Sequence, residues 1–381
     1  MPDASSDLSG PDFLLNPRLD RKARYGDELR AILSLEKGRA AHKAISAWDG
    51  YAPTPLRDLP AIADALDLGQ VLYKDEGGRF GLRSFKALGG AYAVDRLLAA
   101  RGPEGLTVAC ATDGNHGRSV AWGARRAGVK AVIYVHENVS EGRAEAIRSY
   151  GATVVREGRN YDDSVRACAQ AAKANGWQIV SDTSWPGYEE VPKDVMQGYS
   201  VLSNEVEAQG GRPTHVFVQG GVGGIAAAVL SDSWERHGAA RPVFVVVEPE
   251  NAACLLESAR AGAVTAVGGD LETIMAGLAC GEPSILAWRI LQPGADAFMT
   301  VRDAAAADAM RQLATLGVVG GESGVAGLAG LIKAARDPAL RNALQLDASS
   351  RVLCYGTEGA TDPEVYRAIV GRSAEEVSRA A

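Results

Sequence analysis

The stretch TVACATDGNHGRSVAWGARRAG, residues 107–128, decides the fold class. Its first four residues are apolar or β-branched and predict a short buried strand. Residues 118–127 repeat with a helical period and stop at Gly128, a residue type that often follows the last turn of a helix. A polar loop containing glycine joins the two parts. A strand, a loop and a helix in this order predict one half of a βαβ unit.

The same alternation continues on both sides of this stretch. Strands are predicted at residues 70–75, 107–110, 131–135, 153–155, 178–181, 214–219, 242–248 and 352–355, and helices at 84–102, 118–127, 141–150, 162–175, 195–208, 252–261, 271–291 and 304–316. Strands that alternate with helices indicate an α/β fold with a mainly parallel sheet. The chain has 381 residues, more than the roughly 250–300 over which a single core keeps growing. We therefore predict two sub-domains that share a cleft: a smaller α/β domain over residues 84–200, and a larger one formed by residues 1–83 and 201–381.

Charge and cysteine usage narrow the class of partner. The formal net charge is −7, so the chain has no basic field to attract nucleic acid or an anionic membrane surface. No apolar run reaches the roughly 18 residues of a membrane-spanning helix, and the first ten residues lack the features of a secretory signal. Five cysteines without CxxC spacing favour a reducing compartment and no metal site. We expect a cytoplasmic protein with a small-molecule ligand, and a homodimer because that assembly is the commonest.

The first candidate for chemistry is Lys86, in the sequence Ser84-Phe85-Lys86. If Ser84 caps the predicted helix, Lys86 lies at the positive end of the helix dipole, which disfavours its ammonium form. A neutral lysine amine is ready to form a Schiff base. A solvated surface lysine is the alternative. The neighbouring glycines, at positions 77, 78, 81, 89 and 90, favour a ligand site because they let the backbone approach a ligand closely.

The second candidate is the loop Thr112-Asp113-Gly114-Asn115-His116-Gly117, between a predicted strand and a helix. Ligands of open α/β sheets bind at the carboxyl ends of strands, where helix-terminal N–H groups suit a carboxylate or a phosphate. Asn115 can donate a hydrogen bond to a phenolic oxygen. Asp113 is a candidate base or a partner for a substrate ammonium, whereas His116 is equally well explained as a loop-capping or a catalytic residue. Asp182, after the strand 178–181, is predicted at the same sheet edge, although a helix cap explains it too.

The third candidate is the loop Gly220-Gly221-Val222-Gly223-Gly224, again between a strand and a helix. Successive N–H groups in such a loop form a nest for a phosphate monoester. The same residues also match a dinucleotide-binding pattern, with Glu248 placed where a ribose-binding acid would lie. This loop alone leaves a nicotinamide enzyme and a phosphate-bearing cofactor of another kind equally open. Thr357 follows the last predicted strand, and its hydroxyl can meet a heteroaromatic nitrogen, although an ordinary turn explains it nearly as well.

Taken in order, Ser84-Phe85-Lys86, Gly114-Asn115-His116 and the glycine loop resemble the fold-type-II pyridoxal-phosphate enzymes. Within that group the chain resembles the diaminopropionate ammonia-lyases, since threonine dehydratases usually have a small or hydroxylated residue at the place of Asp113. Four further stretches carry the same resemblance: residues 134–138, 181–185, 274–282 and 357–359. The resemblance covers residues 80–363, approximately. One departure is Gly356, where the family leads us to expect a serine.

The resemblance implies conversion of 2,3-diaminopropionate to pyruvate and ammonia, with the cofactor in the cleft between the sub-domains. It implies that Lys86 holds pyridoxal phosphate as a Schiff base and removes the α-proton of the L-isomer, and that Asp113 does so for the D-isomer. Asp182 would bind the distal amine, with Gly114 and His116 also at the substrate. By the same resemblance, Asn115 contacts the pyridoxal oxygen, the residues Gly220, Gly221, Val222, Gly223 and Gly224 contact the phosphate, and Thr357 contacts the ring nitrogen. A threonine or serine dehydratase and a β-replacement synthase of the same fold remain alternatives.

Overall fold

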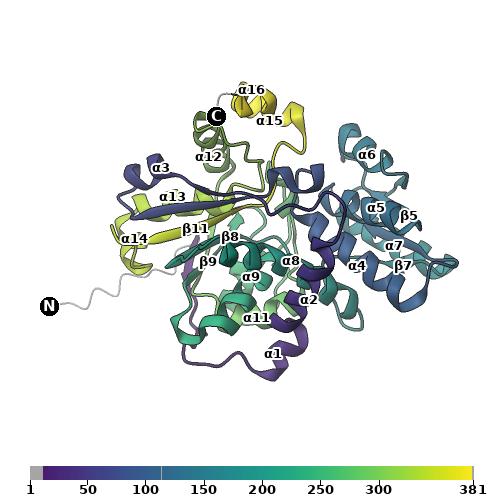
Figure 1. Cartoon of the computed structure of the whole chain (residues 1–381), viewed down its shortest axis with the longest axis horizontal. Helices are drawn as coiled ribbons and strands as arrows, with labels where there is room; N and C mark the ends of the chain where they lie inside the picture. The colour runs from purple at the N-terminus through teal and green to yellow at the C-terminus, as the bar shows by residue number, and fades with distance from the viewer. Residues whose placement is uncertain (1–11, 113, 380–381) are drawn as a thin grey trace.

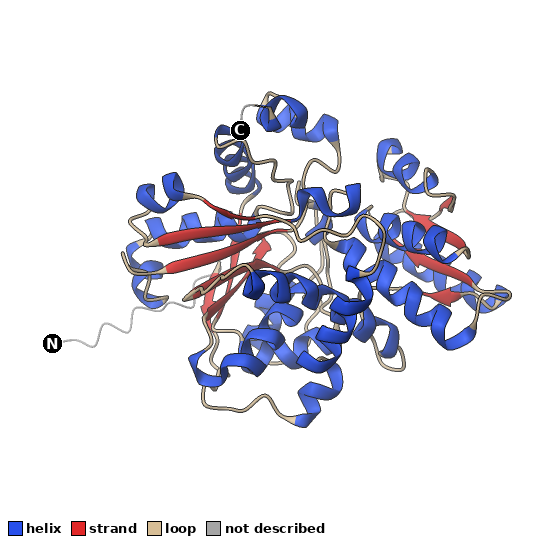
Figure 2. Cartoon of the chain, viewed as in Figure 1, coloured by secondary structure: helices blue, strands red, loops and turns tan. Residues whose placement is uncertain are grey.

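The computed structural model describes residues 12–112 and 114–379, which form two separate β-sheets surrounded by helices (Figure 2). The larger sheet has the order β1-β10-β9-β8-β11-β3-β2 and the smaller one the order β6-β5-β4-β7. The strands are β1 (Phe13–Leu15), β2 (Leu56–Asp58), β3 (Gln70–Asp75), β4 (Thr107–Ala111), β5 (Lys130–Val135), β6 (Thr153–Arg156), β7 (Gln178–Ile179), β8 (His215–Gln219), β9 (Val243–Pro249), β10 (Ala297–Val301) and β11 (Arg351–Gly356). Only the two edge strands β1 and β2 pair antiparallel within the described sheets, and all other neighbours pair parallel. The predicted α/β class with two mainly parallel sheets is confirmed.

The helices connect the strands and cover both sheets (Figure 1). They are α1 (Asp27–Ile32), α2 (Leu35–Ser46), α3 (Pro60–Ala65), α4 (Lys86–Arg101), α5 (Asn115–Ala127), α6 (Glu141–Arg148), α7 (Tyr161–Asn175), α8 (Glu190–Ala208), α9 (Gly224–His237), α10 (Cys254–Ala261), α11 (Ile285–Gly294), α12 (Asp303–Thr315), α13 (Ala326–Arg336), α14 (Pro338–Ala343), α15 (Pro363–Val370) and α16 (Ala374–Ser378). Gly128 and Gly176 end α5 and α7 in the left-handed conformation, with φ of 68° and 70°. These glycines supply a backbone conformation that other residues rarely adopt.

The core follows the two-residue period of the large sheet. Val216 and Val218 of β8 point to the side covered by α8, α9 and α11, whereas Phe217 between them points to the side covered by α12 and α13. The first of these two cores continues through α4 and α8 into the smaller sheet, whose opposite face packs on α7. Both sheets thus lie against the α4–α8 contact, and the carboxyl ends of β4, β8 and β11 lead into one region of the molecule. Among residues 12–112 and 114–379, no helix combines the length and the apolar character needed to cross a bilayer.

The predicted helix at residues 271–291 is correct only in its last part, which belongs to α11. Residues 263–284 are mostly irregular, with one 3-10 turn (Ala276–Leu278), and α11 begins only at Ile285. The backbone of this segment hydrogen-bonds to other parts of the chain, since Gly277 N donates to Ser323 Oγ at 3.0 Å and Ser284 N donates to Val222 O at 2.9 Å. Long-range partners replace the i→i−4 bonds that the apolar pattern favours.

The start of α4 also differs from the prediction. The helix begins at Lys86, two residues later than expected, and Phe85 occupies the N-cap position. Ser84 still contributes, because its hydroxyl accepts a hydrogen bond from Lys86 N at 3.3 Å. The strands β1 and β10, absent from the prediction, pair with each other at the edge of the large sheet. The two sheets lie in the two predicted sub-domains, while the boundaries at residues 84 and 200 stay a prediction.

Candidate active site

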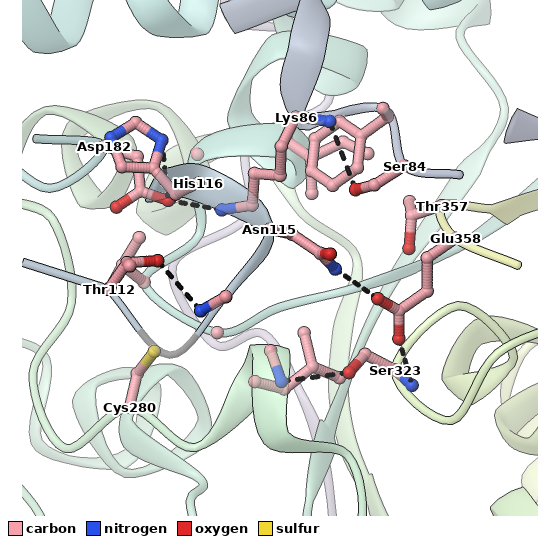
Figure 3. A pocket seen from close by; sticks show the side chains of 18 of the residues that line it. Ser84, Lys86, Thr112, Asn115, His116, Asp182, Cys280, Ser323, Thr357 and Glu358 are labelled. Atoms are coloured by element: carbon pink, nitrogen blue, oxygen red, sulfur yellow. Dashed lines mark hydrogen bonds and ion pairs between the residues drawn. The ribbon is translucent and has the colours of Figure 1, made fainter. Parts of the chain in front are cut away.

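A pocket lies where the loops after β4, β7, β8 and β11 meet the first turn of α4 (Figure 3). Nearly all described site residues predicted from the sequence line it: Lys86, Gly114, Asn115, His116, Asp182, Gly221, Val222, Gly223, Gly224 and Thr357. Gly220 does not, because its N–H donates to Val247 O at 2.9 Å and it closes the end of the sheet. Asp113 lies outside the described residues. The fold therefore gathers side chains from both sub-domains at one place.

Lys86 is held in the pocket from two directions. Phe85 N donates to Thr357 O at 3.0 Å, and Ser119 Oγ donates to Lys86 O at 2.7 Å. Its Nζ forms an ion pair with Asp182 Oδ2, although the two residues are 96 positions apart. Burial alone would lower the pKa of Lys86, but the carboxylate of Asp182 outweighs it and raises this pKa above the ordinary value. The expectation that the helix end leaves the amine neutral is wrong for this state, because Asp182 stabilises the ammonium.

Asp182 follows β7 and its side chain is only 13% exposed. Burial opposes its charge, yet Lys86 and His116 lower the pKa of Asp182 below its ordinary value. The carboxylate thus stays charged inside the pocket as long as a cation faces it. Sequence reasoning placed Asp182 at this sheet edge, and the contact with Lys86 specifies what it does there.

His116 lies beside this ion pair (Figure 3). Its Nε2 is 2.7 Å from Val180 O, so this nitrogen carries the hydrogen and donates it to the carbonyl. Burial lowers the pKa of His116, which keeps the ring neutral. Nδ1 is then an acceptor, and it lies 3.9 Å from Asp182 Oδ2. The buried ring thus braces the backbone after β7 through Nε2 and presents Nδ1 to Asp182.

The loop before α5 is shaped by Thr112. Its Oγ1 accepts hydrogen bonds from Gly114 N and Gly117 N, each at 3.0 Å. Gly114 has a φ of 151°, a conformation that favours glycine. Asn115 begins the helix and donates through Nδ2 to Glu358 Oε2, while its Oδ1 accepts from Arg118 at 3.0 Å. The N-terminal amides of α5 therefore face the pocket, where they suit an anionic group.

The glycine loop forms the opposite wall. Gly223 has a φ of 95° and is the N-cap of α9, which begins at Gly224. The loop is tied down through Val222 O, which accepts from Ser284 N. A loop of successive N–H groups at the start of a long helix is an anion-binding nest. The pocket places this nest and the Lys86 amine in one cavity.

Thr357 is oriented by Gln219. The amide Nε2 of Gln219 donates to Thr357 Oγ1 and to Tyr355 O. Since Thr357 Oγ1 accepts this bond, its own hydrogen is available to an acceptor in the pocket. The departure at Gly356 has a steric reason: a Cβ at this position would overlap the ring of Tyr73. A serine has no room there.

Several pocket residues were not predicted from the sequence, and Tyr199 and Glu358 are two of them. Tyr199 lines the pocket from the middle of α8, where nothing in its neighbourhood distinguishes it from a core residue. Glu358 accepts hydrogen bonds from Asn115 Nδ2 and from Ser323 N. Glu358 could have been predicted, because it follows Thr357 in the stretch 357–359 that resembles the family. Its neighbour Glu322 is buried as well, and burial together with the charge of Glu358 raises the pKa of Glu322 to about 7.

Glu248 does not have the role that a dinucleotide site requires. It is completely buried, and its two oxygens accept hydrogen bonds from Leu255 N at 2.7 Å and Leu256 N at 2.8 Å, in the first turn of α10. Burial raises the pKa of Glu248 to about 8, although these two N–H groups oppose the rise. Both oxygens are engaged within the chain, so the acid is unavailable to a ribose hydroxyl.

This raised pKa predicts a pH-dependent stability. The group favours the folded state below its ordinary pKa of about 4.5, and this contribution is lost as the pH rises through about 8. We expect the free energy of unfolding to carry a term that falls by about 1 kcal/mol per pH unit between pH 5 and 8. Glu248→Gln should remove this term in urea titrations at several pH values, whereas the exposed Glu145→Gln should keep it. Equal slopes in the wild type and Glu248→Gln would contradict the assignment.

Comparison with known proteins agrees with this geometry. A sequence profile of the family described as pyridoxal-phosphate dependent enzyme matches residues 47–357. The chain belongs to this family, and pyridoxal phosphate is its cofactor. The dinucleotide interpretation of the glycine loop is therefore wrong.

Several relatives that match over most of the chain are named diaminopropionate ammonia-lyase. The chain is 40% identical to the diaminopropionate ammonia-lyase of Salmonella typhimurium, over 93% of this chain and 97% of that protein. It is 38% identical to the enzyme of the same name from Escherichia coli K12, over 91% and 94% of the two chains. The solved structure of the E. coli diaminopropionate ammonia lyase in complex with an aminoacrylate-PLP azomethine reaction intermediate covers 94% of this chain and 96% of its own, with a TM-score of 0.87 and 37% identity. The resemblance noted from the sequence is confirmed.

Proposed function

We propose that this chain is a carbon–nitrogen lyase that converts 2,3-diaminopropionate to pyruvate and ammonia. The observation that carries the proposal is the ion pair between Lys86 and Asp182, in a pocket whose opposite wall is an anion nest. The amine suits an aldehyde, the nest suits a phosphate, and the carboxylate suits a second amine. The similarity to two curated enzymes of this activity over more than nine tenths of the chain supports it.

The residues present fit pyridoxal phosphate. Gly221 to Gly224 would hold the phosphate. The loop needs glycine at position 223, because a Cβ there would crowd Leu291, Ala287 and Leu255 and the loop would have to change its conformation. Asn115 would contact the phenolic oxygen, and Thr357 has a hydroxyl hydrogen free for the ring nitrogen. Gly220 supports this loop indirectly, because its N–H donates to Val247 O at the end of the large sheet. When bound, the cofactor supplies the electron sink that makes the α-hydrogen of an amino acid acidic.

Residues of the protein remove the proton and bind the substrate. Lys86 holds the cofactor and, once released, its amine removes the α-proton of the L-isomer. The backbone amides of Asn115 and His116, at the start of α5, receive the substrate carboxylate, because Gly114 N and Gly117 N already donate to Thr112 Oγ1. Asp182 holds the distal ammonium, with His116 beside it. A buried carboxylate favours a substrate with a second positive charge over serine or threonine, whose side chains are neutral.

The test is an assay of pyruvate release from both isomers of 2,3-diaminopropionate, serine and threonine. We expect 2,3-diaminopropionate to give the highest kcat/KM, with ammonia released in a ratio of two to each pyruvate. In sequence, the threonine dehydratase of Pasteurella multocida matches 56% of the chain with 26% identity. A higher kcat/KM for serine or threonine would identify a dehydratase and contradict the proposal. Light scattering would test the expected homodimer, and cell fractionation the expected cytoplasmic location.

Asp113 is proposed as the base for the D-isomer. In the sequence it stands between Thr112 and Gly114, which both line the pocket, and Asp113 itself lies outside the described residues. Asp113→Asn should lower kcat/KM for D-diaminopropionate at least tenfold, since it removes a proton acceptor, and should change the value for the L-isomer much less. Loss of L-isomer turnover with D-isomer turnover intact would reverse the assignment of the two bases.

A further inference from the structure

Three buried polar atoms of pocket residues have no close hydrogen-bond partner among the described residues: Oε1 of Gln219, Nδ1 of His116 and the hydroxyl of Tyr199. Of these residues, His116 and Tyr199 lie near the Lys86–Asp182 ion pair. Both side chains are almost inaccessible, with exposures of 6% and 1%. Leaving a buried polar group unpaired is unfavourable, so each such group in a native protein needs a reason. A ligand that binds there provides one.

Both atoms belong to the surroundings of the same ion pair. His116 Nδ1 is 3.9 Å from Asp182 Oδ2, the oxygen that also pairs with Lys86 (Figure 3). The ring of Tyr199 packs on Phe85 with ring centroids 4.7 Å apart, next to Lys86 in the chain. Its approach is permitted by Gly89, where a Cβ would overlap the tyrosine ring. Burial raises the pKa of Tyr199, and so does the charge of Asp182, whereas the charge of Lys86 and a hydrogen bond to its amine lower this pKa.

The three groups share one chemical property, which is that each can accept a hydrogen bond. Asp182 is a carboxylate, and His116 Nδ1 is an acceptor because Nε2 donates to Val180 O. The phenolic oxygen of Tyr199 accepts as well as donates. A primary ammonium group has three N–H donors and one positive charge. It matches the number of acceptors and the charge of the site.

We propose that Asp182, His116 and Tyr199 together form a receiving site for a primary ammonium group, and that the distal ammonium of a diamino acid occupies it during turnover. The inference rests on the proposed function and makes His116 and Tyr199 determinants of specificity. In this structure the Lys86 ammonium contacts the carboxylate of the site. When the Lys86 nitrogen is engaged with the cofactor, the buried Asp182 needs another cation. The hydroxyl of serine is neutral and brings one donor to three acceptors.

The variants Tyr199→Phe and His116→Gln test this site. Phenylalanine removes only the hydroxyl, while glutamine can keep a donor for Val180 O and removes the acceptor at Nδ1. We expect each variant to lower the ratio of kcat/KM for 2,3-diaminopropionate to kcat/KM for serine by about tenfold or more, as expected for one hydrogen bond to a charged group. Most of the change should be a rise of KM for the diamino acid. Tyr366→Phe is the matched control, because Tyr366 has a buried, unpartnered hydroxyl in α15, away from the pocket.

A second measurement does not depend on turnover. Borohydride treatment should attach the cofactor permanently to Lys86, and calorimetry can then measure how tightly the inert protein binds 2,3-diaminopropionate and serine. We expect tighter binding of the diamino acid, and a difference reduced about tenfold in both variants. An unchanged difference in both variants, or an equal loss of affinity for both amino acids, would overturn the receiving site even if the enzyme eliminates ammonia. If the wild type binds 2,3-diaminopropionate more tightly than serine but does not convert it, the proposed function is refuted and the receiving site is retained.

The melting temperature of the cofactor-free chain separates recognition from a structural role. Among the described residues the hydroxyl of Tyr199 has no close partner, and the group that acts on it most directly is the Lys86 amine, so Tyr199→Phe should leave the melting temperature nearly unchanged. A clear decrease, with equal losses for both substrates, would make Tyr199 a residue that supports the fold and would overturn its role in recognition.

Discussion

Replacing Lys86 with alanine is expected to remove both the colour and the activity of the protein. In the proposed mechanism this amine attaches the cofactor and accepts the α-proton of the L-isomer, so both functions should be lost together. We expect kcat/KM for L-diaminopropionate to fall on the order of 10⁴-fold or more. The yellow absorption band of the wild type should be absent from Lys86→Ala, and it should disappear from the wild type on borohydride reduction.

Lys193→Ala is the control for this experiment. Lys193 lies in the first turn of α8 and pairs with the exposed Glu190 at 2.7 Å. A surface ion pair of this kind contributes little, so colour and activity should stay close to those of the wild type. Retention of the absorption band in Lys86→Ala would mean that another amine holds the cofactor, and the proposed site would be wrong.

Gly223→Ala is expected to weaken cofactor binding by on the order of 100-fold, the loss that follows when charge-assisted hydrogen bonds to the phosphate are misplaced. Gly223 has a φ of 95°, and its added Cβ would lie 3.0 Å from Leu291 Cδ1 and 3.2 Å from Ala287 Cβ. To relieve this crowding the N–H groups at the start of α9 must shift. The dissociation constant can be measured by titrating the cofactor into the cofactor-free protein and following absorbance.

Gly176→Ala is the control for this experiment. It introduces backbone strain at a glycine away from the pocket and so tests whether strain alone weakens cofactor binding. Gly176 has a φ of 70°, ends α7 and has no atom within 4 Å of an added Cβ. It should lower the free energy of unfolding by about 1 kcal/mol and leave cofactor affinity unchanged. Equal dissociation constants for both variants would show that the glycine loop does not hold the phosphate.

The parts of this site that depend on strand ends could be predicted from the sequence. Parallel strands place their carboxyl ends on one edge, so a loop after each strand is a candidate wherever it contains glycine, amide or carboxylate groups. This reasoning placed Asn115, Asp182 and the glycine loop correctly near one another. The same reasoning also assigned Gly220 to the cradle. Its N–H instead donates to Val247 O within the large sheet, and the sequence pattern does not distinguish such an amide from a loop amide.

Features that depend on long-range contacts could not be predicted in this way. The charge of Lys86 is decided by Asp182, and Tyr199 enters the pocket because Gly89 leaves room for its ring. The irregular segment before α11 has a helical pattern of apolar residues, yet its backbone bonds to Ser323 and Val222 from other parts of the fold. Local patterns contain no information on such partners, which tertiary structure supplies.

The segment before Lys86 is bridged to the end of β11, through Ser84 with Glu358 and through Phe85 N with Thr357 O. Lys86 is therefore anchored to the large sheet, although α4 continues into the smaller sub-domain. If the small sheet rotates against the large one, the pivot lies beside the reactive amine. Such a mechanical arrangement would keep the nitrogen at a constant distance from the phosphate cradle, which follows β8 of the same sheet, and Asn115 is tied to the same anchor through Glu358.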